Sequence, residues 1–243
     1  MKEVAFILYS HTDYSDLWEA FFDRVGILLP LTFIKYMFVN CEMSAGDAKK
    51  IPLDYKIVEY DQELYSDRIN HCLEDITEEY LIIQHEDMIL YDKPDKGRLE
   101  NYLKAIKRDE ELDFIKLIKG GDIDDEPCDK HDELFHSKKW LLAIQPTIWR
   151  TASLRKIFYH LSNKGIWELE EVAQQEECRK LGIKGVYCYN GEQQRGRHHW
   201  DSLVYPYIAT AINKGKWNTS EYSSELEELF KEYEIDKSLR GTI

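Results

Sequence analysis

The sequence contains few residues that interrupt a folded chain. Only 6 prolines and 12 glycines occur among 243 residues, and no segment is rich in either type. A chain of this length can bury one sizeable hydrophobic core. Because no Pro- or Gly-rich linker and no internal repeat divides it, we expect one domain over residues 1–217. Residues 218–243 should add a C-terminal helix that is packed on this domain or appended to it.

Long apolar runs are missing as well. No stretch approaches the roughly 18 consecutive apolar residues that a membrane-spanning helix requires. The N-terminus leads directly into an apolar segment of strand type, without the basic and apolar regions of a signal peptide. We therefore expect a soluble, cytoplasmic protein with no transmembrane segment.

Cysteine and positive charge are both scarce. The five cysteines are odd in number and no two form a C-x-x-C pair, so we expect free thiols rather than disulfides or a zinc site. Lys and Arg total 32 against 46 Asp and Glu, which gives a formal net charge of −14. A general nucleic-acid binder needs a basic face to neutralise phosphates, so we expect no nucleic-acid partner.

Apolar segments of strand length alternate with segments of helical periodicity in the first part of the chain. Val4 to Tyr9 is a nearly continuous apolar run, as expected of a strand that is covered on both faces. Further strands are expected at residues 32–39, 56–60 and 80–84, with helices around residues 17–25 and 69–76 between them. This alternation predicts an α/β fold whose central sheet is mostly parallel and flanked by helices.

The later part of the chain continues the pattern less regularly. We expect strands at residues 114–118, 140–144 and 186–189, and helices around residues 99–106, 154–161, 168–181 and 226–233. The acidic segment of residues 122–136 matches no calcium-binding loop. We interpret it as a solvated or acceptor-side loop, although it is a rival metal site.

Two adjacent acids follow the strand of residues 80–84, in His85-Glu86-Asp87. Burying adjacent carboxylates within a sheet costs several kcal/mol each unless they are neutralised. Placing them at the carboxyl end of the strand avoids that cost, because open α/β sheets bind ligands in the crevice there. A divalent cation would offset their charge. The alternative is a strand that ends in a solvated acidic turn.

The order of short motifs resembles the GT-A (Rossmann-like) glycosyltransferases. Arg68 and Asn70 precede His85-Glu86-Asp87 at the spacing at which an Arg-Asn pair precedes a D-x-D motif in many of these enzymes. Asp87 takes the second Asp position, whereas His85 replaces the first. Residues 167–171, followed by Gly182, resemble the acidic start of the acceptor-site helix, and residues 145–150 resemble a group of bacterial and viral glycosyltransferase-like domains. The resemblance covers roughly residues 4–217.

This resemblance implies a nucleoside-diphosphate sugar donor, a glycan or lipid-linked acceptor, and Mn²⁺ or Mg²⁺ as the cofactor. The expected metal ligands are Asp87 with His85 or Glu86, and His198 or His199. The expected donor-binding residues are His11, Thr12, Asp13, Asp61, Arg68, Asn70, Glu86, Arg195 and Arg197. The last two lie in the concentrated cationic stretch of residues 191–201, which could instead be a solvated surface loop. Asp61 and residues 11–13 could equally be turn residues.

The proton acceptor for an inverting transfer should be Glu170 or Glu171, with Glu168 behind them. Adjacent helical residues point about 100° apart, so only one of the pair can face the pocket. The same acids could simply stabilise a helix N-terminus. Gln145, Trp149 and Trp167 are the expected acceptor contacts, although buried core positions would also suit the two Trp side chains.

Two other functions stay open. A sugar nucleotidyltransferase would use a related fold, but it usually carries a Gly-rich, Lys- or Arg-containing loop after the first strand. Residues 10–13 lack such a loop. A degenerate GT-A fold that binds a glycan or a protein partner is the second alternative, because His85 replaces the first acid of the motif.

Overall fold

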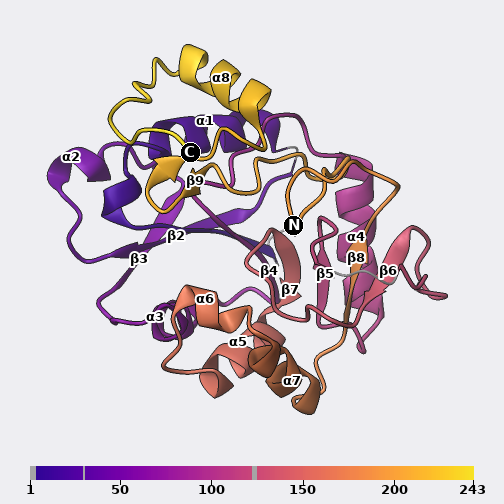
Figure 1. Cartoon of the computed structure of the whole chain (residues 1–243). Coiled ribbons are helices and arrows are strands. Elements are labelled where there is room, and N and C mark those ends of the chain that lie inside the picture. The colour runs from indigo at the N-terminus through magenta and orange to yellow at the C-terminus, as the bar shows by residue number, and fades with distance from the viewer. Residues whose placement is uncertain (1–3, 30, 122–124) are drawn as a thin grey trace.

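The structure, a computed structural model, describes residues 4–29, 31–121 and 125–243. Its centre is an eight-stranded sheet in the order β3-β2-β1-β4-β7-β5-β8-β6 (Figure 1). The strands are β1 (Val4–Tyr9), β2 (Ile34–Asn40), β3 (Tyr55–Tyr60), β4 (Tyr80–His85), β5 (Phe114–Lys116), β6 (Leu134–Ser137), β7 (Thr147–Arg150) and β8 (Gly185–Cys188). A separate hairpin pairs β9 (Ile212–Asn213) with β10 (Lys216–Trp217).

The first four strands run parallel to one another. β1 pairs with β2 on one side and with β4 on the other, and β3 extends the sheet beyond β2. In this register Tyr9 lies beside His85 and Asn40 lies beside Tyr60. The carboxyl ends of four strands therefore meet at one edge, as the alternating sequence pattern predicts.

The second half of the sheet is mixed. β7 runs antiparallel to both β4 and β5, β8 runs parallel to β5, and β6 runs antiparallel to β8. The expected α/β fold with a mostly parallel central sheet flanked by helices is confirmed.

Helices cover both faces of the sheet (Figure 1). One core contains side chains from α1 (Trp18–Leu28), α4 (Lys96–Arg108) and α8 (Ser223–Glu232), and the other contains side chains from α3 (Tyr65–Leu73), α5 (Thr151–His160), α6 (Ile166–Leu169) and α7 (Val172–Lys180). β1 supplies both cores, because Phe6 and Leu8 enter the first whereas Ala5 and Ile7 enter the second. Two short helices, η1 (Thr12–Tyr14) and α2 (Ala45–Ala48), follow β1 and β2. None of the described helices is long and apolar enough to cross a bilayer.

Two elements differ from those expected: the strand at residues 140–144 and the helix at residues 168–181. Residues 140–144 form no strand, and β7 begins instead at Thr147 after Pro146. The backbone N–H and C=O of Leu142 bond to the Gln175 side chain at 3.0 and 2.9 Å, so this apolar run takes a side-chain partner in place of a strand.

The helix expected over residues 168–181 is divided into α6 and α7. Glu171 adopts an extended conformation (φ −75°, ψ 156°) as the N-cap of α7. Strand β6 was not expected at all, because it lies in the segment that we interpreted as an acidic loop. Residues 122–124 of that segment lie outside the described residues.

Candidate active site

A cleft of about 600 Å³ opens at the carboxyl edge of the parallel strands. One wall comes from the ends of β1 and β4 and from η1. The rest of the lining comes from the start of α3, from α6 and from the β9–β10 turn. The side chains discussed below that line this cleft are His11, Asp13, Tyr14, Arg68, His85, Glu86, Asp87, Trp167, Glu170 and Lys214.

Glu86 and Asp87 lie in the turn that follows β4. Glu86 is 6% exposed, and its Oε2 atom has no hydrogen-bond partner. Asp87 accepts a bond from the Ala211 backbone N–H at 3.2 Å through its carbonyl, and its Oδ2 atom lies 3.4 Å from the Ile212 nitrogen. Burial raises the pKa of Asp87 to about 7, and burial next to Asp87 raises the pKa of Glu86 well above its ordinary value. The Ser10 side chain and the Arg240 charge lower the pKa of Glu86, but they do not offset the effect of burial.

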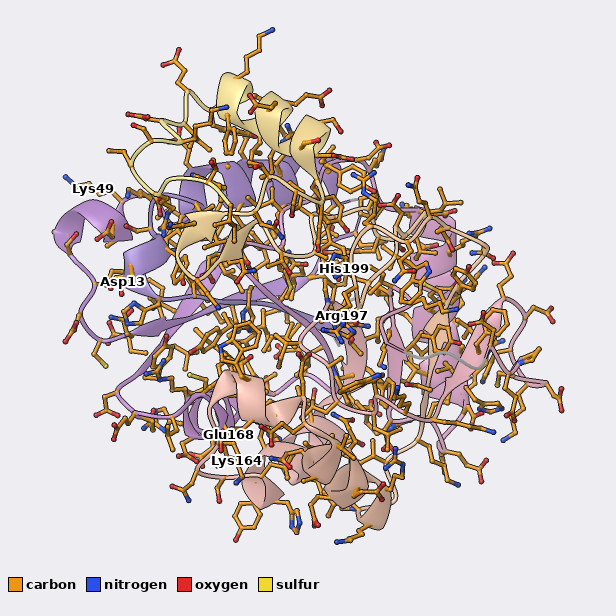
Figure 2. All side chains as sticks on the ribbon, viewed as in Figure 1. Asp13, Lys49, Lys164, Glu168, Arg197 and His199 are labelled. Atoms are coloured by element: carbon orange, nitrogen blue, oxygen red, sulfur yellow. The ribbon has the colours of Figure 1, made fainter. Side chains whose placement is uncertain are left out.

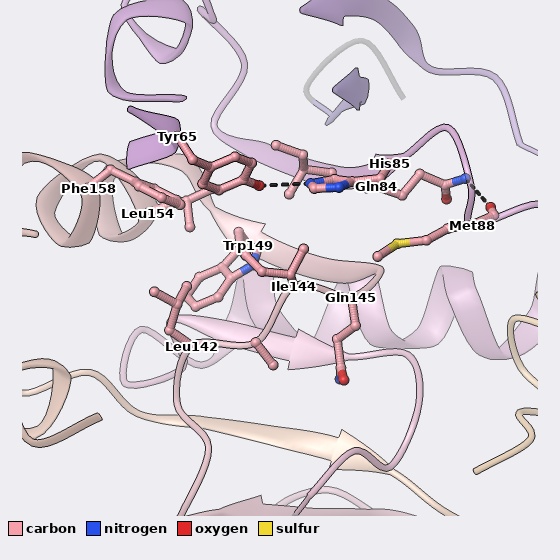
Figure 3. Close-up of a pocket in the computed structure, with 12 residues that line it drawn as sticks. Tyr65, Gln84, His85, Met88, Leu142, Ile144, Gln145, Trp149, Leu154 and Phe158 are labelled. Atoms are coloured by element: carbon pink, nitrogen blue, oxygen red, sulfur yellow. Dashed lines mark hydrogen bonds between the residues drawn. The ribbon is translucent and has the colours of Figure 1, made fainter. Parts of the chain in front are cut away.

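His85 is held by aromatic neighbours. Its Nε2 atom lies 2.8 Å from the Tyr65 hydroxyl, and its ring packs against Tyr9 with centroids 5.0 Å apart. Burial lowers the pKa of His85 to about 4, so the ring is neutral at pH 7. A cavity of about 20 Å³, enough for about one water molecule, lies beside it (Figure 3). Because Tyr65 occupies one ring nitrogen, His85 could reach a metal only through Nδ1.

The turn after β1 brings two of its three expected donor residues to the cleft. His11 and Asp13 line it, and the His11 Nδ1 atom accepts a bond from the Asp13 N–H at 3.2 Å. Thr12 instead faces the end of β2, where its N–H and hydroxyl contact the Asn40 amide at 2.8 and 3.0 Å. Thr12 thus fixes the turn relative to the sheet.

Arg68 lines the cleft from α3 but is largely occupied by the β3–α3 loop. Its guanidinium donates to the carbonyl oxygens of Gln62 and Glu63 at 2.8 and 2.7 Å. Asp61 is exposed and accepts a bond from its neighbour Gln62, and neither Asp61 nor Asn70 is among the residues that line the cleft. Arg68 Nη1 also donates to the Tyr9 hydroxyl at 3.3 Å, so Arg68 could meet an anion only through the N–H groups that these three partners leave free.

α6 brings Trp167 and Glu170 to the cleft. Trp167 is 75% exposed at the rim. Glu170 accepts a bond from the Ile144 N–H at 2.7 Å through Oε1. Glu171 is exposed outside the cleft lining, and Glu168 caps α6 by accepting a bond from the Gly165 N–H at 2.6 Å. The break between α6 and α7 therefore separates the two candidate bases.

Two of the expected acceptor contacts lie below the cleft. Trp149 is 1% exposed and packs against Phe114, with ring centroids 4.7 Å apart. Gln145 donates to the Ile118 carbonyl at 3.3 Å. Both side chains line the 20 Å³ cavity rather than the 600 Å³ cleft (Figure 3).

The loop of residues 191–201 contacts the approach to α8 and is not among the residues that line the cleft. Arg195 bonds to Glu225 and lies over the Tyr222 ring, 4.6 Å from its centroid. His199 Nε2 lies 2.8 Å from Glu221 Oε2. Arg197 and His198 are exposed. In Figure 2, Arg197 and His199 lie well to the right of Asp13, which marks η1.

Lys214 is a cleft residue that the sequence reasoning missed. It occupies the β9–β10 turn with φ 51°, next to Gly215 with φ 78°, and its side chain lines the cleft. The Asn-Lys-Gly turn was the available signal, since Asn and Gly adopt positive φ readily. Without the fold, nothing placed this turn in the same cleft as residues 85–87.

The side-chain oxygen atoms available as metal ligands at this edge suit a hard divalent cation better than a zinc ion. No cluster of three or more His, Cys, Asp or Glu side chains with metal-binding geometry occurs in the described ranges. Glu86 and Asp87 nevertheless offer two carboxylates, one with an unpartnered buried oxygen. Mg²⁺ and Mn²⁺ commonly use one or two carboxylates together with phosphate and water. The residues present fit such an ion if a phosphate completes the site.

No family model matches the sequence, and no curated protein matches it. Similar folds do occur among solved structures. A 4-diphosphocytidyl-2C-methyl-D-erythritol synthase covers 93% of this chain and 99% of its own, with a TM-score of 0.53 and 9% identity. A cytidylyltransferase from Leptospira borgpetersenii covers 98% of each chain, with a TM-score of 0.51 and 11% identity.

A mannosyltransferase from Pyrobaculum calidifontis, solved with GDP-Man and Mn²⁺, is similar over 80% of this chain, with a TM-score of 0.50 and 15% identity. This chain spans only 58% of the length of that enzyme. Nucleotidyltransferases and a glycosyltransferase thus share the GT-A-like architecture with this protein. At these identities the likeness establishes the fold alone.

Proposed function

We propose that this protein is a divalent-metal-dependent glycosyltransferase that moves a sugar from a nucleoside diphosphate to a hydroxyl of a glycan acceptor. One observation carries the proposal. A single cleft is lined by the buried acidic pair Glu86 and Asp87 and also by Glu170 with the exposed Trp167. The acidic pair suits a metal and a diphosphate, whereas Glu170 and Trp167 suit a base and a sugar.

On the donor side, His11 and Asp13 would contact the nucleotide, and Glu86 with Asp87 would hold the cation. The cation would supply charge neutralisation to the diphosphate. Lys214 and the remaining N–H groups of Arg68 would add positive charge to the same cleft, where a lysine binds phosphate as a point charge. Arg195, Arg197, His198 and His199 could join only if their loop moved toward the cleft.

On the acceptor side, the Trp167 ring offers a face on which a sugar can stack. The acceptor hydroxyl oxygen forms a bond to the anomeric carbon while the bond from that carbon to the diphosphate oxygen breaks. The electron pair of the broken bond leaves with the diphosphate, and the hydroxyl proton passes to Glu170. Because Oε1 of Glu170 already accepts the Ile144 N–H, Oε2 is the atom that would take the proton.

A sugar nucleotidyltransferase is the second candidate. The observation that favours it is the near-complete coverage of two nucleotidyltransferases of similar fold, 98% and 99% of their lengths. The turn at residues 10–13 counts against it, because it has no glycine and no Lys or Arg with which to hold a triphosphate.

Calorimetry with UDP, GDP, CDP and the matching triphosphates, with and without Mn²⁺, tests the proposal. We expect Mn²⁺-dependent binding of a diphosphate and hydrolysis of the corresponding nucleotide sugar. Tight binding of a triphosphate, with nucleotide transfer to a sugar phosphate, would select the second candidate. Binding of a glycan without any nucleotide would indicate a degenerate binding module.

Asp87→Asn is the most direct variant, because asparagine keeps an oxygen for the Ile212 N–H but loses the charge. We expect it to weaken Mn²⁺-dependent binding by roughly a hundredfold, the upper end of the loss that follows when even a partner of a metal ligand is removed. Asp92→Asn is the matched control, since Asp92 lies exposed outside the cleft and also accepts a backbone N–H. Equal affinities for the two variants would refute the metal assignment.

A further inference from the structure

The C-terminal tail returns to the turn that follows β1. Arg240 Nε donates to Asp16 Oδ2 at 2.7 Å, and Arg240 Nη2 donates to the Asp13 carbonyl at 2.8 Å. The guanidinium also lies over Tyr14, 5.0 Å from the ring centroid. The Arg240 side chain is only 16% exposed. One residue of the tail thus contacts the backbone, an acid and the aromatic side chain of a single turn, more than 220 positions away in sequence.

The tail is itself fixed to the β9–β10 hairpin. The Trp217 N–H donates to the Gly241 carbonyl at 3.0 Å, and the Ile243 N–H donates to the Trp217 carbonyl at 2.9 Å. A positive φ of 71° at Gly241 turns the chain between Arg240 and this pairing. The position of Arg240 therefore follows that of β10.

The hairpin is in turn fixed to the acidic pair. Asp87 receives the Ala211 and Ile212 N–H groups at 3.2 and 3.4 Å, and β9 pairs with β10. Hydrogen bonds thus run from the end of β4 through the hairpin and the tail to η1. We call this arrangement the collar, and it comprises residues 11–16, 85–87, 211–217 and 240–243. Tyr14, Asp87 and Lys214 all lie on the cleft side of it.

We infer that Arg240 is a positioning residue that closes this collar and holds the η1 turn against the nucleotide side of the cleft. The inference rests on the proposed function, because it assigns the cleft to a nucleoside diphosphate. The turns that follow strands β1 and β4 carry the proposed ligand contacts. Arg240 fixes their relative position by a route that does not pass through the sheet.

Arginine suits this role because its planar guanidinium can bond to a carboxylate and a carbonyl at once and also stack on an aromatic ring. Lysine at position 240 would keep the charge but could not make all three contacts. Glutamine would lose the charge and the bidentate geometry together. These differences allow a graded test.

The test compares Arg240→Gln with Lys237→Gln by calorimetry, with the Mn²⁺ complex of whichever nucleoside diphosphate the wild-type protein binds. Lys237 is the matched control, because it pairs with Glu227 on the exposed surface of the same tail. We expect R240Q to weaken binding about tenfold, which corresponds to about 1.4 kcal/mol. We expect K237Q to bind like the wild type and R240K to be intermediate.

A double-mutant cycle separates positioning from general loss of structure. If Arg240 acts through Asp16, D16N and R240Q should each weaken binding, and the double variant should be no weaker than R240Q alone. Purely structural roles would lower the melting temperature of each variant without this coupling in affinity.

Wild-type affinity in R240Q, or equal weakening in R240Q and K237Q, would overturn the inference and leave the proposed function intact. Failure of the wild-type protein to bind any nucleoside diphosphate would instead overturn the proposed function, and the inference with it.

Discussion

At the end of β4, Glu86 is buried with an unpartnered oxygen, whereas in the loop of residues 191–201 both Arg195 and His199 lie within ion-pair distance of a carboxylate. Hydrogen bonding does not separate the two regions, because Arg195 Nε and His199 Nε2 are also buried without a hydrogen-bond partner. Both regions concentrate ionisable side chains in a short stretch of sequence. In the loop, Glu225 pairs with Arg195, and burial lowers the pKa of His199. At the cleft edge, His85 is neutral and burial raises the pKa of both Glu86 and Asp87, so this pair retains protons that a bound cation would displace.

The difference shows that the density of charge along a sequence does not identify a binding site. A side chain that already has a partner mainly stabilises the fold, because a ligand would have to replace that partner. A side chain that is buried without a partner has its desolvation cost still uncompensated, so a ligand can lower the free energy by supplying the missing charge. By this criterion the cleft edge is the better candidate, and the following predictions test the contrast.

The largest effect should come from Glu170. Glu170→Gln keeps an Oε1 acceptor for the Ile144 N–H but removes the base. We expect sugar transfer to fall by roughly 10²- to 10⁴-fold, the usual contribution of general base catalysis, with donor affinity unchanged. Glu171→Gln, its exposed neighbour, should keep nearly full activity. Initial rates of sugar transfer at saturating donor would measure both variants. A larger loss of rate in the Glu171 variant would identify Glu171, the N-cap of α7, as the base.

The metal-free protein should lose stability as the pH rises through the range from about 4 to 7. The pKa of Asp87 is raised to about 7 in the folded state, so the folded state keeps a proton that the unfolded state releases near pH 4. His85 works in the opposite direction between its lowered pKa of about 4 and its ordinary value near 6.5. The difference between wild type and an Asp87 variant therefore cancels the His85 contribution and reports on Asp87 together with its effect on Glu86.

Asp87→Asn should be more stable than the wild type at pH 7.5 by on the order of 1–3 kcal/mol. At pH 4 the difference should vanish. Urea unfolding in the presence of EDTA at several pH values measures this. Equal pH dependence in both proteins would show that Asp87 titrates normally and would weaken the contrast between the two regions.

Arg195→Gln should lower the stability of the fold rather than the affinity for nucleotide. Loss of its contact with Glu225 leaves a partly buried carboxylate uncompensated, which should cost about 1–3 kcal/mol. The melting temperature should fall by roughly 3–8 °C. Calorimetric scans would measure the change, and nucleotide affinity at 20 °C should stay within about twofold of the wild type. A strong loss of affinity with an unchanged melting temperature would place the loop in the donor site after all.

The smallest expected effect is a difference in nucleotide affinity between variants of two exposed cationic side chains, Lys214 and Arg197. We expect Lys214→Ala to weaken nucleotide binding by about three- to tenfold, because one phosphate contact is worth about 1 kcal/mol when it is exposed to solvent. Arg197→Ala, in the loop, should have less effect. Lys216→Ala is the control on the same hairpin, since Lys216 is exposed and does not line the cleft. A larger effect of R197A than of K214A would indicate that the loop closes over bound nucleotide.

Local patterns were enough to predict β1 to β4 and the helices between them, because a strand buried on both faces and an amphipathic helix each leave a periodic signature. They failed at residues 140–144, where Leu142 bonds to Gln175 from a helix 33 positions away. They also failed at β6, whose partner β8 lies some 50 residues later in the chain. In both places the partner of the backbone, rather than its own composition, decides the conformation.

By itself, the sequence determined that acids would meet at the carboxyl edge of a parallel sheet, since strand, turn and acid are contiguous in residues 80–87. Only the tertiary structure decided which other charges share that edge. It brought Lys214 to the cleft, Arg240 to the turn after β1 and Arg195 to α8, and it placed Glu170 in the cleft lining while leaving Glu171 outside. The physical reason is that charges interact through space, and the pairing of distant segments sets those distances.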